Sequence, residues 1–386
     1  MVKFSRILDL DLPTEQSAFL WGARKTGKST YLQQKYPHSL VYDFLKTDLF
    51  IDFHRRPFLL REQLLARKAE ELAHPIILDE VQKVPTILDE VHWLIENRGL
   101  QFVLCGSSAR KLKRGQANLL GGRAWRFEMH PLVSVEVGEL DLLKALNRGL
   151  IPDHYLQNRY HRSLAAYARD YMKEEVFDEG LTRNIPAFTR FFDALGYSHG
   201  EVTNFSNIAR DCGIDAKTVR AYYEILVDTH LGRWVEPYTK RTTRQIITKS
   251  PKFYLFDVGI AGCLSGRQLE KRQGAEFGKA LEHLMLMELA AYSSYRELHF
   301  PIRFWRTKSG LEVDYVLGAG EVAIEVKSSR RIDRRDFRGI KAFRESYKPC
   351  TCIIVCQEST RREVDEIAIL PWREFLSKLW GDEIIH

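Results

Sequence analysis

The sequence predicts an α/β protein in which a helical region separates two parts built from short strands and helices. Residues 17–132 alternate short apolar runs with helix-length polar segments, residues 155–230 have a helical apolar period, and short strands return from Phe300 onward. Strands separated by helix-length segments are typical of βαβ units, which form mostly parallel sheets. We therefore expect three domains, over residues 1–150, 151–250 and 251–386.

Length and composition exclude several classes of protein. The chain has 386 residues, with 58 Lys and Arg against 51 Asp and Glu, and 45% of its residues are hydrophobic. These values are typical of a folded protein with two or three domains. No apolar run is long enough to cross a bilayer, the N-terminus lacks the apolar segment of a signal peptide, and the six cysteines lack zinc-binding spacing. We expect a cytoplasmic protein with reduced thiols and no membrane partner, and its basic excess is compatible with nucleic acid.

Residues 22–29, Gly-Ala-Arg-Lys-Thr-Gly-Lys-Ser, match the pattern GxxxxGK[ST] between an apolar strand and a helix-length segment. In this pattern the glycines let backbone N–H groups surround the β-phosphate. Lys28 is expected to reach the β and γ oxygens, and Ser29 to place its hydroxyl on Mg²⁺. The predicted ligand is ATP, and the predicted binding residues are Gly22, Ala23, Arg24, Lys25, Thr26, Gly27, Lys28, Ser29 and Thr30.

Two adjacent carboxylates, Asp79 and Glu80, follow the apolar run of a second buried strand. Beside a phosphate-binding loop, we expect Asp79 to hold Mg²⁺ through water and Glu80 to polarise the water that attacks ATP. A third strand, residues 101–105, leads to Ser107, which is expected beside the γ-phosphate, although a helix N-cap is an equal alternative for this serine. The alternative for the whole set is a structural glycine turn beside an exposed acidic pair.

Three arginines are candidates for an arginine finger, a side chain that reaches the nucleotide of a neighbouring subunit. Arg123 follows two glycines on a turn before a short strand, and Arg110 and Arg114 compete with it for this role. Any of the three is alternatively a solvated surface cation. An arginine that acts in trans would require a homo-oligomer.

Residues 203–223 have the rhythm of a helix-turn-helix. Ser206 is expected to cap the first helix, Gly213 to make the turn and Asp215 to cap the second helix. The second helix then presents Lys217 and Arg220 outward, where contacts to a DNA major groove would lie. The residues expected to face inward are Ile208, Ala209, Val219 and Leu226.

A basic segment without acidic residues follows, from Pro237 to Phe256. A hairpin there would form a wing whose cations contact phosphates. These cations are Lys240, Arg241, Arg244, Lys249 and Lys252. DNA is therefore the predicted partner, with Lys217, Arg220, Lys240, Arg241 and Arg244 as the predicted contacts. Alternatively, such modules serve in ATPases as lids or as protein contacts.

The last domain contains charged residues with the spacing of a metal-dependent site. Asp314 lies on one strand and Glu325 and Lys327 lie on the next, so alternation along a hairpin brings them to one face. Glu282, on a predicted helix, adds a fourth group. Converging carboxylates need a divalent cation, Mg²⁺ or Mn²⁺, and Asp314 and Glu325 are its predicted ligands. With an adjacent lysine, such a cation supports phosphodiester hydrolysis. The alternative is a surface hairpin with a ladder of charges.

The ordered set of motifs resembles a prokaryotic family of AAA+-type ATPases whose C-terminal half, of unassigned function, is related to PD-(D/E)XK nucleases. The resemblance extends over nearly the whole chain, from residues 22–29, 78–82 and 106–108 to residues 249–259, 278–282, 305–306, 310–316 and 325–328. It implies an AAA+ P-loop NTPase domain, a winged helix in the middle region and a restriction-endonuclease-like C-terminal domain. By the same resemblance, Glu282, Asp314, Glu325 and Lys327 occupy the positions of the nuclease motif.

Three functions are compatible with these motifs, and the sequence ranks them as follows. The first is an enzyme in which an ATPase controls a DNA-binding, metal-dependent nuclease-like domain. The second is a nucleotide-gated switch or scaffold whose C-terminal domain binds DNA or a partner without cleavage. The third is an ATP-gated transcriptional regulator, which depends on the helix-turn-helix alone. For the first, the predicted catalytic residues are Glu80, Arg123, Glu282, Asp314, Glu325 and Lys327.

Overall fold

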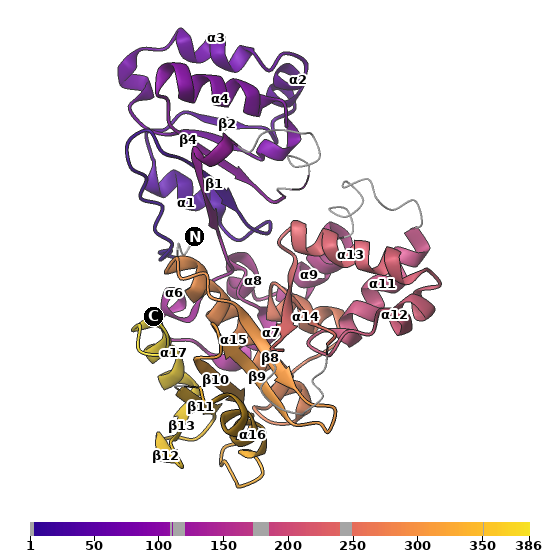
Figure 1. Cartoon of the computed structure of the whole chain (residues 1–386). Helices are drawn as coiled ribbons and strands as arrows, with labels where there is room; N and C mark the ends of the chain where they lie inside the picture. The colour runs from indigo at the N-terminus through magenta and orange to yellow at the C-terminus, as the bar shows by residue number, and fades with distance from the viewer. Residues whose placement is uncertain (1–3, 109, 111–119, 173–184, 240–248, 350) are drawn as a thin grey trace. The chain divides into compact units, whose positions relative to one another are not determined.

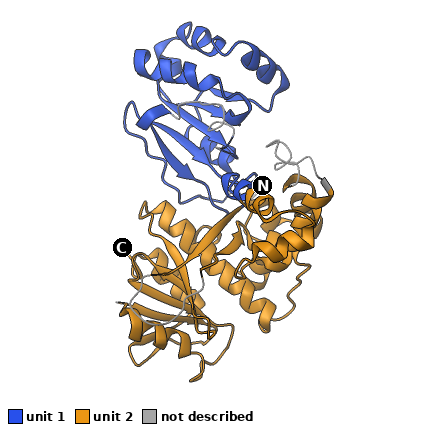
Figure 2. Ribbon diagram, turned by 45° about the vertical axis from the view of Figure 1, so that its right-hand side comes forward, with its two compact units in different colours: residues 1–131, 175–181, 224–231 blue, residues 132–174, 182–223, 232–386 orange. Residues whose placement is uncertain are grey.

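The computed structural model describes residues 4–108, 110, 120–172, 185–239, 249–349 and 351–386. Within these ranges the chain forms two compact units (Figure 2). Unit 1 covers the described chain up to Pro131 together with Glu224–Leu231, and unit 2 covers the remaining described residues. This division places residues 132–150 with the later part of the chain, unlike the predicted boundary at 150. No helix among the described residues is long and apolar enough to span a membrane.

Unit 1 is built on a five-stranded sheet with the order β2-β3-β4-β1-β5 (Figure 1). Every neighbouring pair is parallel, as the alternation of strands and helices predicts. The strands are β1 (Ser17–Trp21), β2 (Val41–Asp43), β3 (Ile76–Asp79), β4 (Phe102–Gly106) and β5 (Ala124–Glu128). The helices are α1 (Lys28–Lys35), α2 (Thr47–Arg55), α3 (Leu59–Leu65) and α4 (Ile87–Arg98).

The central strands of this sheet are mostly apolar because both of their faces are covered. All residues of β1, β3 and β4 are buried. On one face, side chains such as Phe19 and Leu104 pack with Val91 and Leu94 of α4 in a single core cluster. Continuous burial of this kind is typical of parallel sheets, and it leaves the carboxyl ends of the strands as the place for polar groups.

Unit 2 begins with helices and continues into a large mixed sheet. Its helical part comprises α6 (Ser134–Val137), α7 (Leu142–Arg148), α8 (Pro152–Leu156), α9 (Tyr160–Ala166), α11 (Ile185–Ser198), α12 (Phe205–Cys212) and α13 (Ala216–Asp228), whose last residues group with unit 1. The later helices are α14 (Val258–Leu264), α15 (Ala275–Tyr295), α16 (Arg338–Tyr347) and α17 (Trp372–Trp380).

The sheet of unit 2 has eight strands in the order β12-β13-β11-β10-β9-β8-β6-β7. They are β6 (Gly232–Pro237), β7 (Lys252–Leu255), β8 (Ile302–Arg306), β9 (Glu312–Leu317), β10 (Val322–Val326), β11 (Thr351–Cys356), β12 (Arg362–Val364) and β13 (Ile367–Pro371). Strands β8, β9 and β10 form an antiparallel meander, and β10, β11 and β13 are parallel. The predicted hairpin over β9 and β10 is confirmed.

The predicted helix-turn-helix elements are present as α12 and α13. Gly213 has the left-handed conformation at the end of α12, with φ 66°, and Asp215 accepts hydrogen bonds from the backbone of Lys217 and Thr218. The cap of α12 is a correction, because the side chain of Asn204 caps this helix and Ser206 lies inside it. The four residues expected to face inward, Ile208, Ala209, Val219 and Leu226, are buried.

An antiparallel pair of strands, β6 and β7, follows these helices and joins them to the large sheet. Gly232 lies opposite Leu255, and a Cβ atom at Gly232 would lie 2.3 Å from the ring of Phe253. Beyond this close contact, β6 pairs in parallel with β8 through Glu236 and Pro237. The hairpin is therefore part of the same sheet as the C-terminal strands.

Candidate functional sites

The glycine-rich loop lies between β1 and α1, at the carboxyl edge of the first sheet. Gly27, with φ 99°, precedes α1, and Lys25 has a left-handed conformation that is uncommon outside glycine, with φ 64°. The ammonium of Lys28 donates hydrogen bonds to the carbonyls of Gly22 (2.7 Å) and Ala23 (3.0 Å). Left-handed backbone of this kind is often found at functional sites, and here it lies in the loop whose N–H groups are expected to surround a phosphate.

Arg6 supports this loop and was not identified from the sequence. Its guanidinium donates to the carbonyl of Thr26 (2.6 Å) and to the carbonyl of His130 (2.7 Å). Gly22 packs against the residues that follow β5. A Cβ atom on Gly22 would lie 2.5 Å from the carbonyl oxygen of Met129. No local pattern indicates this role, because Arg6 lies in an extended segment far from the loop in sequence.

The structure brings the loop and the acidic strand end together, as the sequence predicts. The hydroxyl of Ser29 donates a 2.6 Å hydrogen bond to Oδ2 of Asp79, and both residues belong to the predicted Mg²⁺ set. Thr26 is buried and bonds to Ala23, whereas Lys25, Ser29 and Thr30 are exposed at the surface of the loop. A hydroxyl beside a carboxylate is a donor set that suits the hydrated magnesium ion of a nucleotide.

Glu80 and Ser107 are joined through Gln82, the last residue of the run 78–82 that carries the family resemblance, for which the sequence indicated no role. The amide of Gln82 donates to Oε2 of Glu80 (2.5 Å) and to Oγ of Ser107 (3.1 Å). Gly106 permits this bridge, since a Cβ atom there would lie 2.3 Å from Oε1 of Gln82. Glu80 has a left-handed backbone, with φ 56°, and burial raises the pKa of its carboxyl above the ordinary value. A buried carboxyl with a raised pKa is suited to accept a proton from water.

The candidate arginines lie in different places. Arg123 precedes β5 at the edge of the sheet opposite the glycine-rich loop, where its backbone carbonyl bonds to Ser17 and its side chain pairs with Glu96. It is therefore too far to serve the nucleotide of its own chain. Arg110 pairs with Asp228 at 2.8 Å, and both belong to unit 1. Arg114 lies outside the described residues.

In unit 2 the four residues of the predicted metal-dependent site come together. Asp314 on β9 and Glu325 on β10 each adjoin the paired residues Tyr315 and Ile324, and Oδ2 of Asp314 accepts a 2.7 Å hydrogen bond from the backbone of Val326. Lys327 Nζ pairs with Oε1 of Glu325 at 2.6 Å. Glu282 lies on α15, whose backbone at that residue accepts a bond from the Tyr315 hydroxyl of β9. Asp314 and Glu325 are buried, so the set is not a surface ladder of charges.

Three further residues belong to this cluster and were missed or misassigned. Lys252, expected on a DNA-contacting wing, is instead 4% exposed, because its ammonium lies 2.6 Å from Glu312 and 3.3 Å from Glu282. The hydroxyl of Tyr254 donates a 2.5 Å bond to Glu282. Glu312 begins β9, two residues before Asp314 and on the same face of the strand. The period-2 spacing was the one signal that could have identified Glu312.

Burial dominates the electrostatics of this cluster. It raises the pKa of Asp314 well above its usual range, and the neighbouring charge of Glu325 acts in the same direction. Burial also raises the pKa of Glu325 to about 7. For Lys252, burial alone would lower the pKa, but the charges of Glu282 and Glu312 raise it. The carboxylates therefore depend on nearby cations to stay ionised.

Two histidines form a closed ring of contacts beside the cluster. The backbone N–H of Leu255 donates to Nδ1 of His199 (3.2 Å), Nε2 of His199 meets Nδ1 of His283 (3.1 Å), and Nε2 of His283 meets the carbonyl of Leu255 (2.7 Å). This ring closes only when both imidazoles are neutral. Burial favours that state, since it lowers the pKa of His283 to about 3. The ring fixes α15, and with it Glu282, against β7.

A cavity of about 130 Å³ opens onto the carboxylates of Glu282, Glu312 and Asp314. Its rim carries charged residues, namely Glu201, Lys279 and Arg306. Carboxylate oxygens are suitable ligands for Mg²⁺ or Mn²⁺, and Oε2 of Glu325 is buried without a hydrogen-bond partner among the described residues. In the described part of the chain, however, no three acidic, histidine or cysteine side chains are arranged to hold a metal ion. The carboxylates have the oxygen atoms that a divalent cation needs. In this structure Glu282 and Glu312 instead pair with Lys252, and Glu325 pairs with Lys327.

The predicted DNA contacts are only partly described. Lys217 and Arg220 are exposed on α13, and the guanidinium of Arg220 lies 4.2 Å from the ring centre of Phe205. Lys240, Arg241 and Arg244 lie outside the described residues. Exposed arginines follow the cluster residue Lys327. Arg330, Arg331, Arg334 and Arg335 lie between β10 and α16, and Arg338 is the first residue of α16. Both regions offer cations of the kind that contact phosphates.

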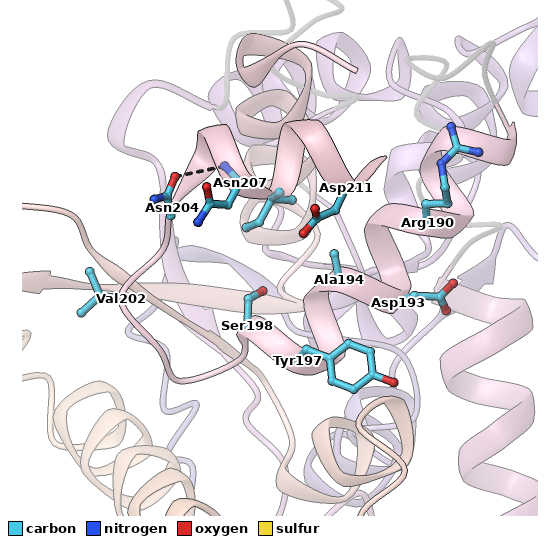
Figure 3. Close-up of a pocket in the computed structure, with 10 residues that line it drawn as sticks. Arg190, Asp193, Ala194, Tyr197, Ser198, Val202, Asn204, Asn207 and Asp211 are labelled. Atoms are coloured by element: carbon cyan, nitrogen blue, oxygen red, sulfur yellow. Dashed lines mark hydrogen bonds between the residues drawn. The ribbon is translucent and has the colours of Figure 1, made fainter. Parts of the chain in front are cut away.

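A second cavity, of about 460 Å³, lies between α11 and α12 (Figure 3). Asp193 and Tyr197 contribute to it from α11, and Asn207 and Asp211 contribute from α12. The cavity lies on the helical part of unit 2 and shares no lining residue with the cavity at the carboxylate cluster.

Comparison with protein families divides the chain into three parts. Residues 14–138 match the model of an AAA domain. Residues 139–271 and 277–375 match two domains of unknown function, DUF8612 and DUF4143. No curated protein matches the chain. Together with the glycine-rich loop and the Asp79–Glu80 pair, the first match identifies the beginning of the chain as an AAA-type P-loop domain.

Four solved chains align with this chain, and two of them are as follows. The Walker-type ATPase paby2304 of Pyrococcus abyssi has 15% identity and a TM-score of 0.43, over 67% of this chain and 99% of that one. The Aeropyrum pernix ORC1 protein in complex with DNA has 13% identity and a TM-score of 0.25, over 65% of this chain and 86% of that one. Both scores are too low to establish a shared overall fold.

Proposed function

We propose that this protein hydrolyses ATP in its AAA-type domain, binds DNA, and controls a divalent-cation-dependent nuclease-like site in its C-terminal half. The ATPase part is supported chiefly by the hydrogen bond between Ser29 and Asp79, which joins the glycine-rich loop to the acidic strand end. Their meeting at the carboxyl edge of a parallel sheet is the arrangement in which nucleotides bind.

Each residue of the AAA-type domain has a distinct role in this proposal. The loop N–H groups and Lys28 bind the phosphates, and Ser29 and Asp79 hold Mg²⁺, which neutralises phosphate charge when bound. Glu80 orients the attacking water and accepts its proton. Gln82 fixes the carboxyl of Glu80 and connects it to Ser107, which lies at the end of β4.

The ATPase assignment is tested with two variants. Glu80→Gln should bind ATP with ordinary affinity but hydrolyse it at least about a hundredfold more slowly, because the amide cannot accept a proton. Lys28→Ala should no longer bind ATP. Phosphate release and ATP binding are measured for both. Hydrolysis by Glu80→Gln at the wild-type rate would show that Glu80 is not the base.

The nuclease part is supported by the convergence of Glu282, Asp314, Glu325 and Lys327 in one buried cluster beside a cavity. The residues of the cluster come from consecutive parts of the domain, with Glu282 on α15, Asp314 on β9 and Glu325 on β10. In the proposal, the carboxylates hold a divalent cation that activates water and stabilises negative charge on phosphate. Lys327 positions the water, and the arginines before α16 hold the nucleic acid.

Cleavage of supercoiled plasmid and of single-stranded DNA tests this part, with Mg²⁺ or Mn²⁺ and with or without ATP. Wild-type protein should nick DNA, and Asp314→Asn should lose nicking while it keeps ATPase activity. The matched control is Asp333→Asn, an exposed acidic residue that follows β10. Nicking that survives Asp314→Asn would contradict the assignment.

A nucleotide-gated switch without cleavage is the second candidate. It is favoured by one observation, the occupation of the carboxylates by Lys252 and Lys327. A switch predicts DNA binding that changes between ATP and ADP and no nicking under any of the conditions above.

A further inference from the structure

The carboxylate cluster of unit 2 contains a cation of its own in Lys252. We infer that Lys252 acts as an internal counter-ion that occupies the place of a divalent cation, and that the cation binds when this side chain leaves. The inference rests on the proposed metal-dependent function and adds a control of access to that site.

The contacts of Lys252 are those of a bound ion. The side chain is 4% exposed, and its ammonium lies between two carboxylates, 2.6 Å from Oε1 of Glu312 and 3.3 Å from Oε1 of Glu282. These two carboxylates and Asp314 line the same cavity as Lys252. An ammonium and a divalent cation both require oxygen ligands, so they compete for the same atoms.

The balance of charge favours this exchange. Four carboxylates, Glu282, Glu312, Asp314 and Glu325, meet three cations, because Arg306 also pairs with Glu312 at 3.5 Å. With all groups ionised, one negative charge is unbalanced. Replacing the single charge of Lys252 by a double charge balances the cluster, and buried charges are stable only when they are paired.

The second observation that points to a ligand is Glu325. This residue is 5% exposed, Lys327 binds its Oε1 atom, and its Oε2 atom has no hydrogen-bond partner in the part of the chain that the structure describes. A buried carboxylate oxygen without a donor is costly. A divalent cation in the cluster supplies the missing partner.

The backbone at Lys252 is bonded to the segment that leads into α12. Lys252 begins β7, and residues 251 and 252 bond to the segment between α11 and α12: Thr203 N–H donates to the Pro251 carbonyl at 2.8 Å, and Val202 bridges to Lys252. Thr203 immediately precedes the Asn204 cap of α12. In the inference, a ligand that displaces α12 would act on the backbone of Lys252 through these two contacts.

The test is direct binding of Mn²⁺ to the full-length protein. Binding is measured as the loss of the electron paramagnetic resonance signal of free Mn²⁺. Lys252→Met keeps the length of the side chain and removes its charge. We expect it to bind Mn²⁺ at least about tenfold more tightly than wild type, while Lys252→Arg, which keeps the charge, stays close to wild type. The matched control is Lys279→Met, a cation on the rim of the same cavity that pairs with Glu201 and is mostly exposed.

Thermal unfolding supplies a second measurement that does not depend on activity. Mn²⁺ should raise the melting temperature of Lys252→Met more than that of wild type, and adding Asp314→Asn to Lys252→Met should abolish the gain. If Lys252→Met folds only when Mn²⁺ is present, the ion replaces the amine, as the inference requires. A variant that Mn²⁺ fails to restore contradicts it.

The remaining outcomes separate this inference from the proposed function. Equal Mn²⁺ affinity in wild type and Lys252→Met, with cleavage that depends on Asp314, would overturn the role of Lys252 and leave the nuclease intact. Absence of Mn²⁺ binding in every variant would overturn both.

Discussion

Gln82, the last residue of the run 78–82, shows how a side chain beside the acidic pair can organise a reaction centre. It bonds to both Glu80 and Ser107, and Gly106 leaves the space that its amide occupies. Without it, the Glu80 carboxyl would rotate freely in a buried site. The alignment of a proton acceptor depends on such second contacts, because small displacements of a reacting group are costly.

Replacing Gln82 should therefore slow ATP hydrolysis while nucleotide affinity is kept. We expect kcat to fall about tenfold in Gln82→Ala and in Ser107→Ala, and the double variant to lose little more, since both changes break one chain of bonds. Steady-state kinetics measure this. Gln101→Ala is the control, because Gln101 bonds to Pro13 and Gln16 ahead of the start of β4. Additive losses would show that the two residues act independently.

Glu288 provides a titration that is separate from both sites. This buried residue of α15 accepts hydrogen bonds from Ser134 and from the indole of Trp380, and burial raises its pKa to about 7. The folded state thus keeps a proton that the unfolded chain releases at lower pH. The stability it contributes is full below the unfolded value near 4.5 and is lost as pH rises through about 7.

The free energy of unfolding of the wild type should accordingly fall between pH 5 and pH 8, by on the order of 3 kcal/mol at most. The melting temperature should fall with it. Glu288→Gln cannot titrate, so its melting temperature should vary less over this range. Calorimetry at a series of pH values measures the difference. Glu297→Gln, an exposed glutamate just after α15, should follow the wild type. A parallel pH profile in Glu288→Gln would refute the assignment.

Residue-level prediction from sequence succeeded where a function needs adjacent residues. Gly22 to Ser29, Asp79 and Glu80 were found because their spacing is local, and Ser107 because it follows a strand. Arg6 was missed because it lies outside every motif. Gln82 lies in the run 78–82, but its contact with Ser107, 25 residues away, forms only in the fold, so the sequence indicated no role for it. Lys252 was read as a surface cation because its partners Glu282 and Glu312 are distant in sequence, so its burial depends on tertiary contacts alone.

At the level of elements, helices α11 and α14 approach each other closely at one glycine. A Cβ atom on Gly196 would lie 2.6 Å from the carbonyl oxygen of Leu264 at the end of α14. In contrast, Gly278 in α15 has ordinary space, with 3.4 Å to the flexible side chain of Ser328. Both glycines lie in helices, but Gly196 is closely packed against backbone atoms and Gly278 is not.

Gly196→Ala should lower the free energy of unfolding by about 2 kcal/mol, because backbone atoms of α14 cannot move aside cheaply. Gly278→Ala should be neutral or stabilise by up to about 1 kcal/mol, since alanine favours a helix. Urea unfolding followed by circular dichroism compares them. If both substitutions have the same effect, the contact between α11 and α14 is not tight in solution.

Helix α13 carries the cations that the DNA hypothesis needs. Replacing both Lys217 and Arg220 by alanine should weaken binding to duplex DNA at least about tenfold and reduce the slope of log affinity against log salt by about two. Fluorescence anisotropy at several salt concentrations measures both quantities. Arg210→Ala on α12, also exposed, is the control. An unchanged slope would mean that α13 does not contact phosphates.

Strand prediction worked best for buried strands with strong apolar runs. The apolar runs at residues 17–21 and 322–326 coincide with β1 and β10, and those at 75–79, 313–317 and 351–355 differ from β3, β9 and β11 by one residue at one end. The run at 101–105 is shifted by one residue relative to β4, which covers Phe102–Gly106. Strands β12 and β13 were missed, because β12 is only three residues long and largely exposed. The union of β6 and β7 with the C-terminal strands also escaped prediction, since parallel pairing of β6 with β8 leaves no local signature.

At the scale of the whole molecule, the chain returns from unit 2 to unit 1 within one helix. Residues up to Tyr223 of α13 belong to unit 2, and Glu224–Leu231 group with unit 1. The helix that presents Lys217 and Arg220 is thus continuous with a segment of the nucleotide-binding unit. Such continuity is a physical route for coupling between two ligands.

Nucleotide state should therefore change DNA affinity. We expect the DNA dissociation constant of Glu80→Gln to differ at least about threefold between ATP and ADP, which corresponds to a modest coupling energy. Lys28→Ala should respond to neither nucleotide. Anisotropy titrations with saturating nucleotide measure this. Identical affinities in both states would show that the two functions are independent.

The shared sheet of unit 2 also limits where this chain can be cut. A fragment beginning at residue 275 would contain the region that matches DUF4143, yet it would lack β6 and β7. Strand β8 would then end the sheet with unpaired N–H and C=O groups, a surface that invites aggregation. Glu282 and Glu312 would also lose Lys252. Expression of the C-terminal part as a soluble piece therefore requires a start before Gly232, so the functional module is longer than the family match.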